Sequence, residues 1–175
     1  MATKQITEVD VTWMVRQDLD DVMRIERLSF PYPWTEEEMM SCLRRPNCIG
    51  MVARRGNVVA GFMLYELLRS QLHVINFAVH PEFRRQEVGS QMVDKLLAKL
   101  AQQGRTEIVL EVRERNLAAQ LFFRRTGFVS AGVIRNYYDD TDEDAYRLVR
   151  GLWVSEVLTD DNGKFIQMNI REGIE

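Results

Sequence analysis

The sequence predicts a single soluble α/β domain, and three observations favour this fold class. Strand-like and helix-like stretches alternate along the chain. Its 175 residues, of which 46% are hydrophobic, suffice for one domain with one core. There is neither an internal repeat nor a low-complexity linker that would divide the chain. Residues 1–11 are expected to form a flexible N-terminus, residues 12–154 the domain, and residues 155–175 a C-terminal extension.

The N-terminal half reads as one strand, two helices and three further strands. Asp18 can cap the first helix, and Thr35 with Glu38 three residues later is a capping-box signature for the second. The two prolines at 31 and 33 exclude regular helix between them. Gly56-Asn57 is a turn signal between two apolar runs. The expected elements are Thr12–Arg16, helix Asp18–Leu28, helix Glu36–Leu43, Ile49–Arg54, Val58–Leu67 and His73–Val79.

The C-terminal half continues the alternation. Apolar residues recur at helical spacing from Val88 to Leu100, with Gly104 as a C-terminal cap. Asn116 can cap another helix that Gly127 closes. The expected elements are the helix from Val88, strand Ile108–Val112, helix Leu117–Thr126, strand Phe128–Ile134 and strand Ala145–Val154.

The tail resembles a hairpin, with Val154–Leu158 and Phe165–Ile170 on either side of a turn that contains Gly163. One interpretation is an extension of the sheet edge. The other is a contact with a partner or a second copy, because an exposed strand edge offers unpaired backbone groups.

Composition excludes several classes of function. A formal net charge of −3 is poor for general binding of nucleic acid, which depends on neutralising phosphates. The two cysteines do not make a disulfide framework, and Cys and His lack zinc-ligand spacing, so no metal is expected. No apolar run is long enough to span a bilayer, and the N-terminus has no signal core. We therefore expect a cytoplasmic protein with no membrane partner.

The segment from Val74 to Ser90 carries the most information about chemistry. It reads as a strand, a short turn at His80-Pro81, a basic loop with Arg84 and Arg85, and the start of a helix. The free N–H groups of a helix N-terminus, together with its dipole, form an anion site that arginines strengthen. The alternative is a surface turn that happens to hold two arginines.

This segment resembles the acyl-CoA-binding motif of the GNAT superfamily of N-acetyltransferases. In that family a strand ending in valine and a proline precede an R/Q-x-x-G-x-G/A loop, here Arg84–Gly89. The residues 110–113, 116 and 121–128 resemble the family's LEVR…N…LY…GF block. Phe30–Thr35 and Asn136–Tyr138 resemble the FP-PWS and NYY segments of ribosomal-protein alanine N-acetyltransferases. The resemblance covers roughly residues 12 to 150.

The resemblance implies a fold, a cofactor and roles for residues. The fold is a GNAT-like (acyl-CoA N-acyltransferase) mixed, splayed β-sheet with helices on both faces, and the cofactor is acetyl-CoA. The backbone of Phe77, Ala78 and Val79 would pair with the pantetheine arm like an added strand. Asn116 would contact the cofactor near its thiol, although a plain helix cap is the alternative and both can hold. The residues expected around the pyrophosphate are Arg84, Arg85, Gln86, Glu87, Val88, Gly89 and Ser90.

Glu111 is the expected catalytic base. A carboxylate on a largely covered strand is costly unless it has a partner or a task. In the similar enzymes this glutamate takes a proton from the substrate amine through water, which the chemistry requires because only a neutral amine attacks a thioester. The alternative is an ion pair of Glu111 with Arg113 or Arg115.

Two positions depart from the family pattern. Glu87 replaces the first loop glycine, which lets the backbone turn tightly beside phosphate. Phe123 replaces a tyrosine that, in related enzymes, protonates the leaving thiolate. We still expect Phe123 to lie near the cofactor. Tyr137, Tyr138 or water could take over that protonation, with Tyr138 the catalytic candidate, or turnover could be slow.

The acceptor is expected to be an amine, namely the N-terminus of a protein such as a ribosomal protein. Tyr32, Trp34, Tyr137 and Tyr138 would flank the acceptor groove, since aromatic residues make rigid walls for a peptide. Trp34 can also be a staple that packs its loop onto the core. The alternatives are a lysine, a polyamine or another small amine as acceptor, and a low-activity module that only senses acyl-CoA. Either a monomer or a homodimer is expected.

Overall fold

A computed structural model describes residues 8–152, 157–159 and 165–167 of the chain. Seven strands form one sheet in the order β1-β2-β3-β4-β5-β7-β6, in which only β4 and β5 run parallel. The mixed sheet that was predicted is therefore confirmed. The strands are β1 (Asp10–Trp13), β2 (Cys48–Arg55), β3 (Val58–Leu67), β4 (Gln71–Val79), β5 (Glu107–Arg113), β6 (Val129–Tyr138) and β7 (Glu143–Gly151).

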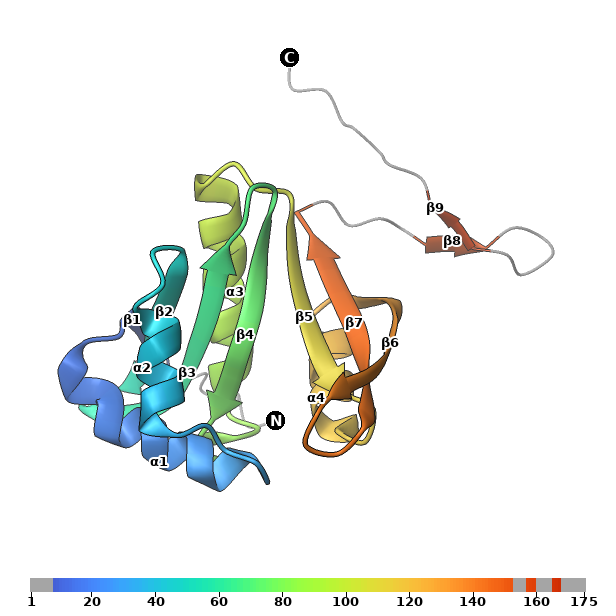
Figure 1. The fold of residues 1–175 in the computed structure, drawn as a ribbon. Coiled ribbons are helices and arrows are strands. Elements are labelled where there is room, and N and C mark those ends of the chain that lie inside the picture. The colour runs from blue at the N-terminus through green and yellow to red at the C-terminus, as the bar shows by residue number, and fades with distance from the viewer. Residues whose placement is uncertain (1–7, 153–156, 160–164, 168–175) are drawn as a thin grey trace, which may run out of the picture.

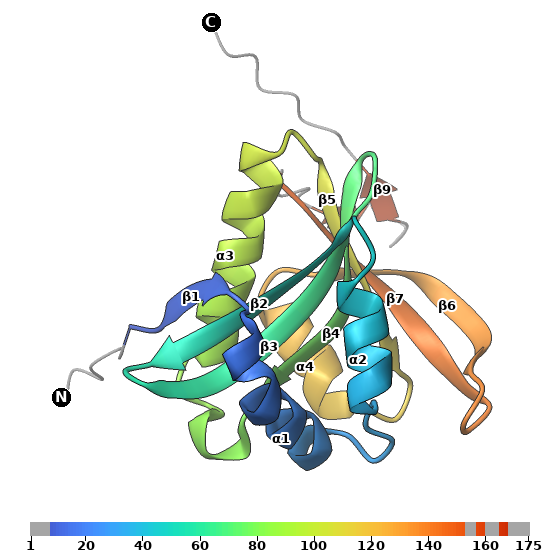
Figure 2. The same cartoon turned by 60° about the vertical axis from the view of Figure 1, so that its left-hand side comes forward.

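Helices cover both faces of the sheet, as Figures 1 and 2 show. On one face α1 (Leu19–Ser29) and α2 (Glu36–Leu43) enclose a core with Phe62 and Leu64 of β3. On the other face α3 (Val88–Gln102) and α4 (Leu117–Arg125) pack over the remaining core. Among the described residues no helix is long and apolar enough to cross a membrane.

The capping box predicted for α2 is present. Thr35 Oγ1 accepts from the backbone N–H of Glu38 at 3.2 Å, and the Glu38 carboxylate accepts from the N–H of Thr35 at 2.7 Å. Asp18, in contrast, does not cap α1. Its carboxylate accepts from the N–H of Val15 at 2.9 Å and pairs with Arg54, so the segment 16–18 turns as a short 3-10 helix.

The sheet parts at its centre (Figure 1). The parallel pairing of β4 with β5 runs from Gln71↔Glu107 to Val74↔Leu110 and goes no further. A register shift against β3 follows at once, because Leu64 pairs with Asn76 whereas Tyr65 pairs with Val74. The shift leaves Ile75 as an extra residue, and such a bulge bends a strand and re-aims its side chains. From Ile75 to Val79, β4 therefore has a strand neighbour only on the β3 side.

The N-terminal boundary differs from the prediction. Val9 and Val11, assigned above to a flexible segment, are each 7% exposed and belong to the core. The strand expected at Thr12–Arg16 runs from Asp10 to Trp13 because β1 pairs with β2 from Asp10↔Arg54 to Trp13↔Met51. Burial of these valines, rather than local propensity, decides where the strand lies.

The hairpin expected in the tail has two described strands, β8 (Val157–Thr159) and β9 (Phe165–Gln167). They pair antiparallel with each other as a two-stranded sheet. They do not extend an edge of the seven-stranded sheet, contrary to the first interpretation of this segment. The rest of the extension lies outside the described residues.

Candidate active site

The open edge of β4 exposes backbone groups in an alternating pattern. The N–H of His80 donates to Ala60 O of β3 at 2.8 Å. Because backbone groups of a strand point to alternate sides, those of Ala78 also face β3, and those of Phe77 and Val79 face the parted side. In agreement with this pattern, the carbonyl of Val79 accepts from a side chain, Arg84 Nε at 2.9 Å. An extended ligand can pair with this edge as a strand does.

The loop between β4 and α3 is held in a strained backbone conformation. Arg85 and Glu87 have φ values of 62° and 64°, in the left-handed region that favours glycine. Gln86 braces the loop, since its Oε1 accepts from Arg55 Nη1 at 2.5 Å and its Nε2 donates to Glu82 O at 2.6 Å. Glu87 is the N-cap of α3 and has ψ 5°. It therefore adopts the left-handed conformation, with a conformational strain that glycine at this position would avoid.

The first turn of α3 lies against α4. A Cβ at Gly89 would stand 2.9 Å from Phe122 Cζ and 3.5 Å from Val79 Cγ2, which explains the need for glycine at this position. Val88 is buried, Ser90 is half-buried, and no acidic residue stands in this first turn. The N–H groups that begin a helix have no partner within it, so this turn can hold an anion.

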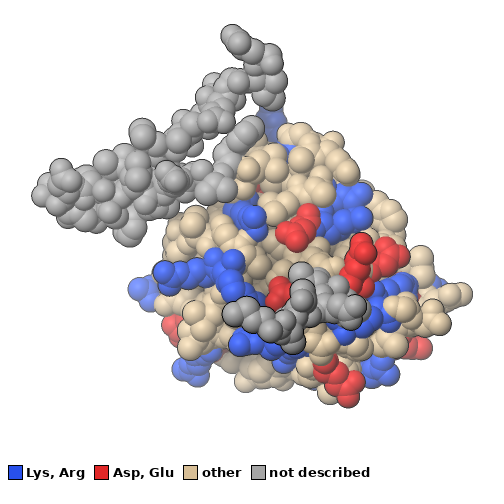
Figure 3. Space-filling view, turned by 180° about the vertical axis from the view of Figure 1, so that it is seen from behind, with Lys and Arg blue, Asp and Glu red and all other residues tan. Residues whose placement is uncertain are grey.

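Arg84 is folded back onto the protein. In addition to its bond with Val79, its Nη2 donates to Ser29 Oγ at 3.1 Å, which ties the end of β4 to the end of α1. Its expected contact with a pyrophosphate would require the side chain to leave these two partners. Figure 3, which views the α3 and α4 side, shows lysine and arginine side chains interspersed with acidic ones over this face.

Four phenylalanines connect the open edge of β4 with α4. The ring centroid of Phe123 lies 5.4 Å from that of Phe77, 5.0 Å from Phe122 and 5.2 Å from Phe128, each pair edge to face. Phe123 is 6% exposed. Phe123, which was predicted to lie near the cofactor, is thus a buried ring that packs against Phe77.

Asn116 acts as the helix cap that was one of its two interpretations. Its Oδ1 accepts from the N–H of Ala119 at 3.1 Å, and α4 begins at the next residue. The amide Nδ2 is not used by this cap and could still serve a ligand.

Glu111 lies just past the point where β4 and β5 part, and it has two partners. Its Oε2 is 2.6 Å from His73 Nε2 of β4, and its Oε1 accepts from Arg147 Nε of β7 at 3.0 Å. The side chain of Glu111 is 5% exposed. Burial alone raises the pKa of this carboxyl, but the hydrogen bonds and charges of His73 and Arg147 outweigh it and hold the pKa below its usual value.

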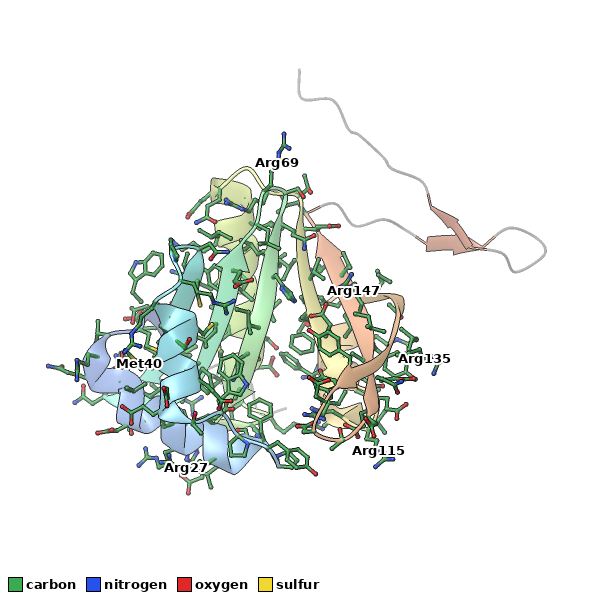
Figure 4. All side chains as sticks on the ribbon, viewed as in Figure 1. Arg27, Met40, Arg69, Arg115, Arg135 and Arg147 are labelled. Carbon is green, nitrogen blue, oxygen red and sulfur yellow. The ribbon has the colours of Figure 1, made fainter. Side chains whose placement is uncertain are left out.

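The ion pair suggested as an alternative for Glu111 is wrong. Arg113 pairs instead with Asp140 at 2.5 Å and Glu143 at 3.1 Å, and Arg115 lies 3.5 Å from Glu143. Figure 4 shows Arg147 beside β5 in the C-terminal half of the sheet and Arg115 near the lower end of that half. Glu111 and Arg147 stand opposite each other in the pairing of β5 with β7. Their side chains meet because directly opposed residues share a face of the sheet.

Aromatic side chains from distant segments meet at Arg113. Its guanidinium carbon lies 3.9 Å from the ring centroid of Tyr138 and 5.5 Å from that of Tyr32. Tyr137 lies 5.0 Å from Tyr138, edge to face. Burial raises the pKa of Tyr138 to about 12, and burial followed by the charge of Glu111 raises that of Tyr137. Three of the four expected acceptor-side aromatics therefore lie together, and the charge of Glu111 acts on two of them, Tyr137 and Tyr138.

Trp34 lies in the same loop as Tyr32, and a buried carboxylate holds this loop. Glu26 of α1 is 1% exposed, and its Oε1 accepts from the N–H of Trp34 at 2.9 Å. Its Oε2 accepts from Asn76 Nδ2 of β4 at 3.0 Å. The indole of Trp34 packs against the core of α1 and α2, which fits its role as a staple. Glu26 thus joins the loop to the bulged part of β4.

Sequence reasoning missed three residues of this site, His73, Arg147 and Glu26, and it assigned Arg113 to another partner. His73 and Glu111 are ionisable residues flanked on both sides by apolar residues of their strands, which was a usable signal. Glu26 stands three and four residues after Met23 and Val22, so helical spacing placed it on the apolar face of α1. The partners themselves depend on strand register, which the sequence does not reveal.

Comparison with known proteins agrees with this geometry. Residues 19–128 match the model of the acetyltransferase (GNAT) family. The ribosomal protein bS18-alanine N-acetyltransferase of Escherichia coli K12 is 31% identical over 130 residues, which are 73% of this chain and 87% of that protein. The Salmonella typhimurium enzyme of the same name is 25% identical over 138 residues, 79% of this chain and 93% of its own length.

Solved structures extend the comparison to the fold. The E. coli ribosomal-protein-S18-alanine N-acetyltransferase superposes with a TM-score of 0.74 at 26% identity, covering 86% of this chain and 99% of its own. Ard1 from Thermoplasma volcanium gives 0.75 at 28% identity, covering 83% and 98%. An aminoglycoside 6'-N-acetyltransferase complexed with coenzyme A gives 0.69 at 16% identity, covering 82% and 97%, which shows a shared fold.

Proposed function

The chain belongs to the GNAT family of acetyltransferases, and from this premise we propose that it acetylates the N-terminal α-amino group of a protein, such as a ribosomal protein. It is an acetyl-CoA-dependent N-acetyltransferase, so the acetyl donor follows from the family. The observation that carries the proposed acceptor is the meeting of Tyr32 and Tyr138 across Arg113, next to Glu111. Rigid aromatic walls beside a base suit an extended peptide end.

The residues around the parted sheet fit acetyl-CoA. The backbone of Phe77 and Val79 faces the parted side and can pair with a pantetheine arm. Gly89 lets α3 approach α4 closely, and the N–H groups of its first turn can receive the pyrophosphate. We propose that Arg84–Ser90 hold the diphosphate mainly through their backbone, with Arg85 as the nearby cation, and that Asn116 and Phe123 lie toward the thiol end.

The residues support direct transfer within a ternary complex. Glu111 draws a proton from the acceptor amine through a water molecule, since an α-amino group has a pKa of about 8 and is mostly charged at neutral pH. The backbone N–H of Val79 polarises the thioester carbonyl. Phe123 has no proton to give, and we propose that Tyr138, which burial keeps protonated, or water serves the leaving thiolate. A thiolate leaves tolerably unaided, because a thiol has a pKa near 8.5.

A thiol-release assay with a panel of acceptors tests this proposal. CoA release should be detected with short peptides that have a free N-terminus and should vanish when that terminus is blocked. Release with polyamines or with an internal lysine alone would favour the small-amine or lysine alternative. Tight binding of acetyl-CoA without turnover on any amine would favour the acyl-CoA-sensing alternative, which Glu87 and Phe123 suggest.

Two further expectations stay predictions. A ribosomal acceptor would place the work of this chain in the cytoplasm, without direct binding of nucleic acid or membrane. Either a monomer or a homodimer is expected, and light scattering of the purified protein distinguishes them.

A further inference from the structure

The proton that leaves the acceptor amine needs a group that can hold it, and Glu111 alone holds it poorly. Both of its oxygens already accept hydrogen bonds, from His73 on one side and Arg147 on the other. These two partners hold the pKa of Glu111 below its ordinary value, so the carboxylate is a weak base. An efficient base has a pKa close to the working pH.

His73 is placed to supply what Glu111 lacks. At 2.6 Å from Glu111 Oε2, Nε2 of His73 must share a proton with the carboxylate, because two bare acceptors would repel each other at this distance. With that proton on Nε2, the lone pair of a neutral imidazole is on Nδ1. In the part of the chain that the structure describes, Nδ1 has no hydrogen-bond partner, and the side chain is 25% exposed.

We propose that His73 is the residue on which the amine proton comes to rest, with Glu111 as the carboxylate that orients the imidazole and stabilises its charged form. This inference rests on the proposed function and deepens it. The N–H bond of the acceptor ammonium breaks, and its electron pair stays on nitrogen for the attack on the thioester. Water passes the proton on, and an N–H bond forms at Nδ1 of His73. The imidazolium returns the proton to solvent after the transfer.

Charged groups lie around His73 on three strands, β3, β5 and β7. Glu111 contacts it from β5, and Arg147 lies on the far side of that carboxylate. On β3 its cross-strand neighbour is Glu66, which Arg45 neutralises at 2.5 Å. A carboxylate bonded to one ring nitrogen fixes the tautomer and stabilises the imidazolium. Glu111 and His73 therefore act together, and the imidazole ring is the group that holds the proton.

His73→Gln is the decisive variant. The glutamine amide can still donate to Glu111 where Nε2 did, but it cannot accept the amine proton. With an acceptor peptide and saturating acetyl-CoA, we expect kcat to fall about 100-fold. The dependence of kcat/KM on pH should also change, because only the ionisation of the acceptor amine then remains in its rising limb. The affinity for acetyl-CoA, measured by calorimetry, should stay within about threefold of wild type, because the variant keeps the fold.

Two controls exclude a merely structural effect. His80→Gln removes the only other imidazole in the sequence and should keep the wild-type pH limb, whatever it does to the KM for acetyl-CoA. His73→Ala should regain rate when imidazole is added, which a variant that fails only by misfolding does not do. If His73→Gln retains the wild-type rate and pH limb, the inference is overturned while the proposed function stands. A wild-type protein that releases no CoA with any amine overturns both.

Discussion

The buried carboxylate of Glu26 offers a test of the link between α1, the loop with Trp34 and the bulged strand. Glu26→Ala removes the acceptor for two donors, the N–H of Trp34 and Nδ2 of Asn76. A buried donor left without a partner costs about 1–3 kcal/mol. Relief from burying a carboxyl offsets part of this, so we expect a loss of roughly 2–4 kcal/mol in the free energy of unfolding.

Glu26→Gln should behave differently. The glutamine oxygen can accept from Trp34, and its amide can donate to Oδ1 of Asn76, a buried acceptor with no partner in the described part of the chain, once the Asn76 amide turns over. Because the variant also removes a carboxyl that burial disfavours, we expect stability within about 1 kcal/mol of wild type near neutral pH. Urea unfolding measures both variants. A loss above about 2 kcal/mol for Glu26→Gln would refute this account of the brace.

The same variant has a signature in pH. Burial raises the pKa of Glu26, with the charge of Glu38 adding to it, so the folded state binds this proton more tightly than the unfolded chain. Binding of this proton contributes fully to the stability of the folded state at pH values below the ordinary glutamate pKa. The contribution is lost as pH rises through the pKa that Glu26 has in the folded state. The stability of Glu26→Gln relative to wild type should therefore increase between about pH 4 and pH 8.

Glu38→Gln is the matched control for this pH dependence. Hydrogen bonds from Thr35 lower the pKa of Glu38, so its contribution is present above the ordinary pKa and lost as pH falls. The relative stability of Glu38→Gln should accordingly decrease as pH rises, opposite in sign to Glu26→Gln. Equal slopes for the two variants would contradict the assignment of the buried charge.

The remaining predictions concern the catalytic groups and the loop. Glu111→Gln should lower kcat at least about 100-fold with acetyl-CoA affinity nearly intact by calorimetry, and full activity would remove Glu111 from the mechanism. Glu87→Gly should raise the free energy of unfolding by roughly 1 kcal/mol in urea titrations, because glycine adopts φ 64° without strain; a clear loss would contradict the strain. Phe123→Tyr should preserve or raise the rate of CoA release, and a large loss in a folded variant would show another role for this ring.

Local signals predicted much of the fold. The capping box at Thr35 and Glu38 placed α2 at the residues where it lies, and the Gly56-Asn57 turn placed the hairpin of β2 and β3. These signals act between residues close in sequence, where backbone hydrogen bonding follows directly from residue type. The first strand was misplaced because its position depends on pairing with β2, a partner far along the chain.

The candidate site was likewise predicted only where neighbouring residues in the sequence carry a signal. The motif around Gly89 and the carboxylate at 111 follow from the sequence, and so do the aromatics at 32 and 138. The partners of Glu111 do not, because the register of β4 against β5 pairs residues that lie on either side of α3 in the chain. The bulge at Ile75, which ends that register, has no local sequence mark. Arg113 had been considered as a partner of Glu111, whereas Asp140 and Glu143 compete for it successfully.

The parted sheet has a consequence for the exchange of backbone hydrogens. Amides of Ala78 and His80 point toward β3 and should exchange slowly with deuterated solvent, while those of Phe77 and Val79 point toward the side where β5 has diverged and should exchange fast. Protection along this short run should therefore alternate from one residue to the next. A ligand that lies along the strand as proposed would slow the fast amides and make the run uniform.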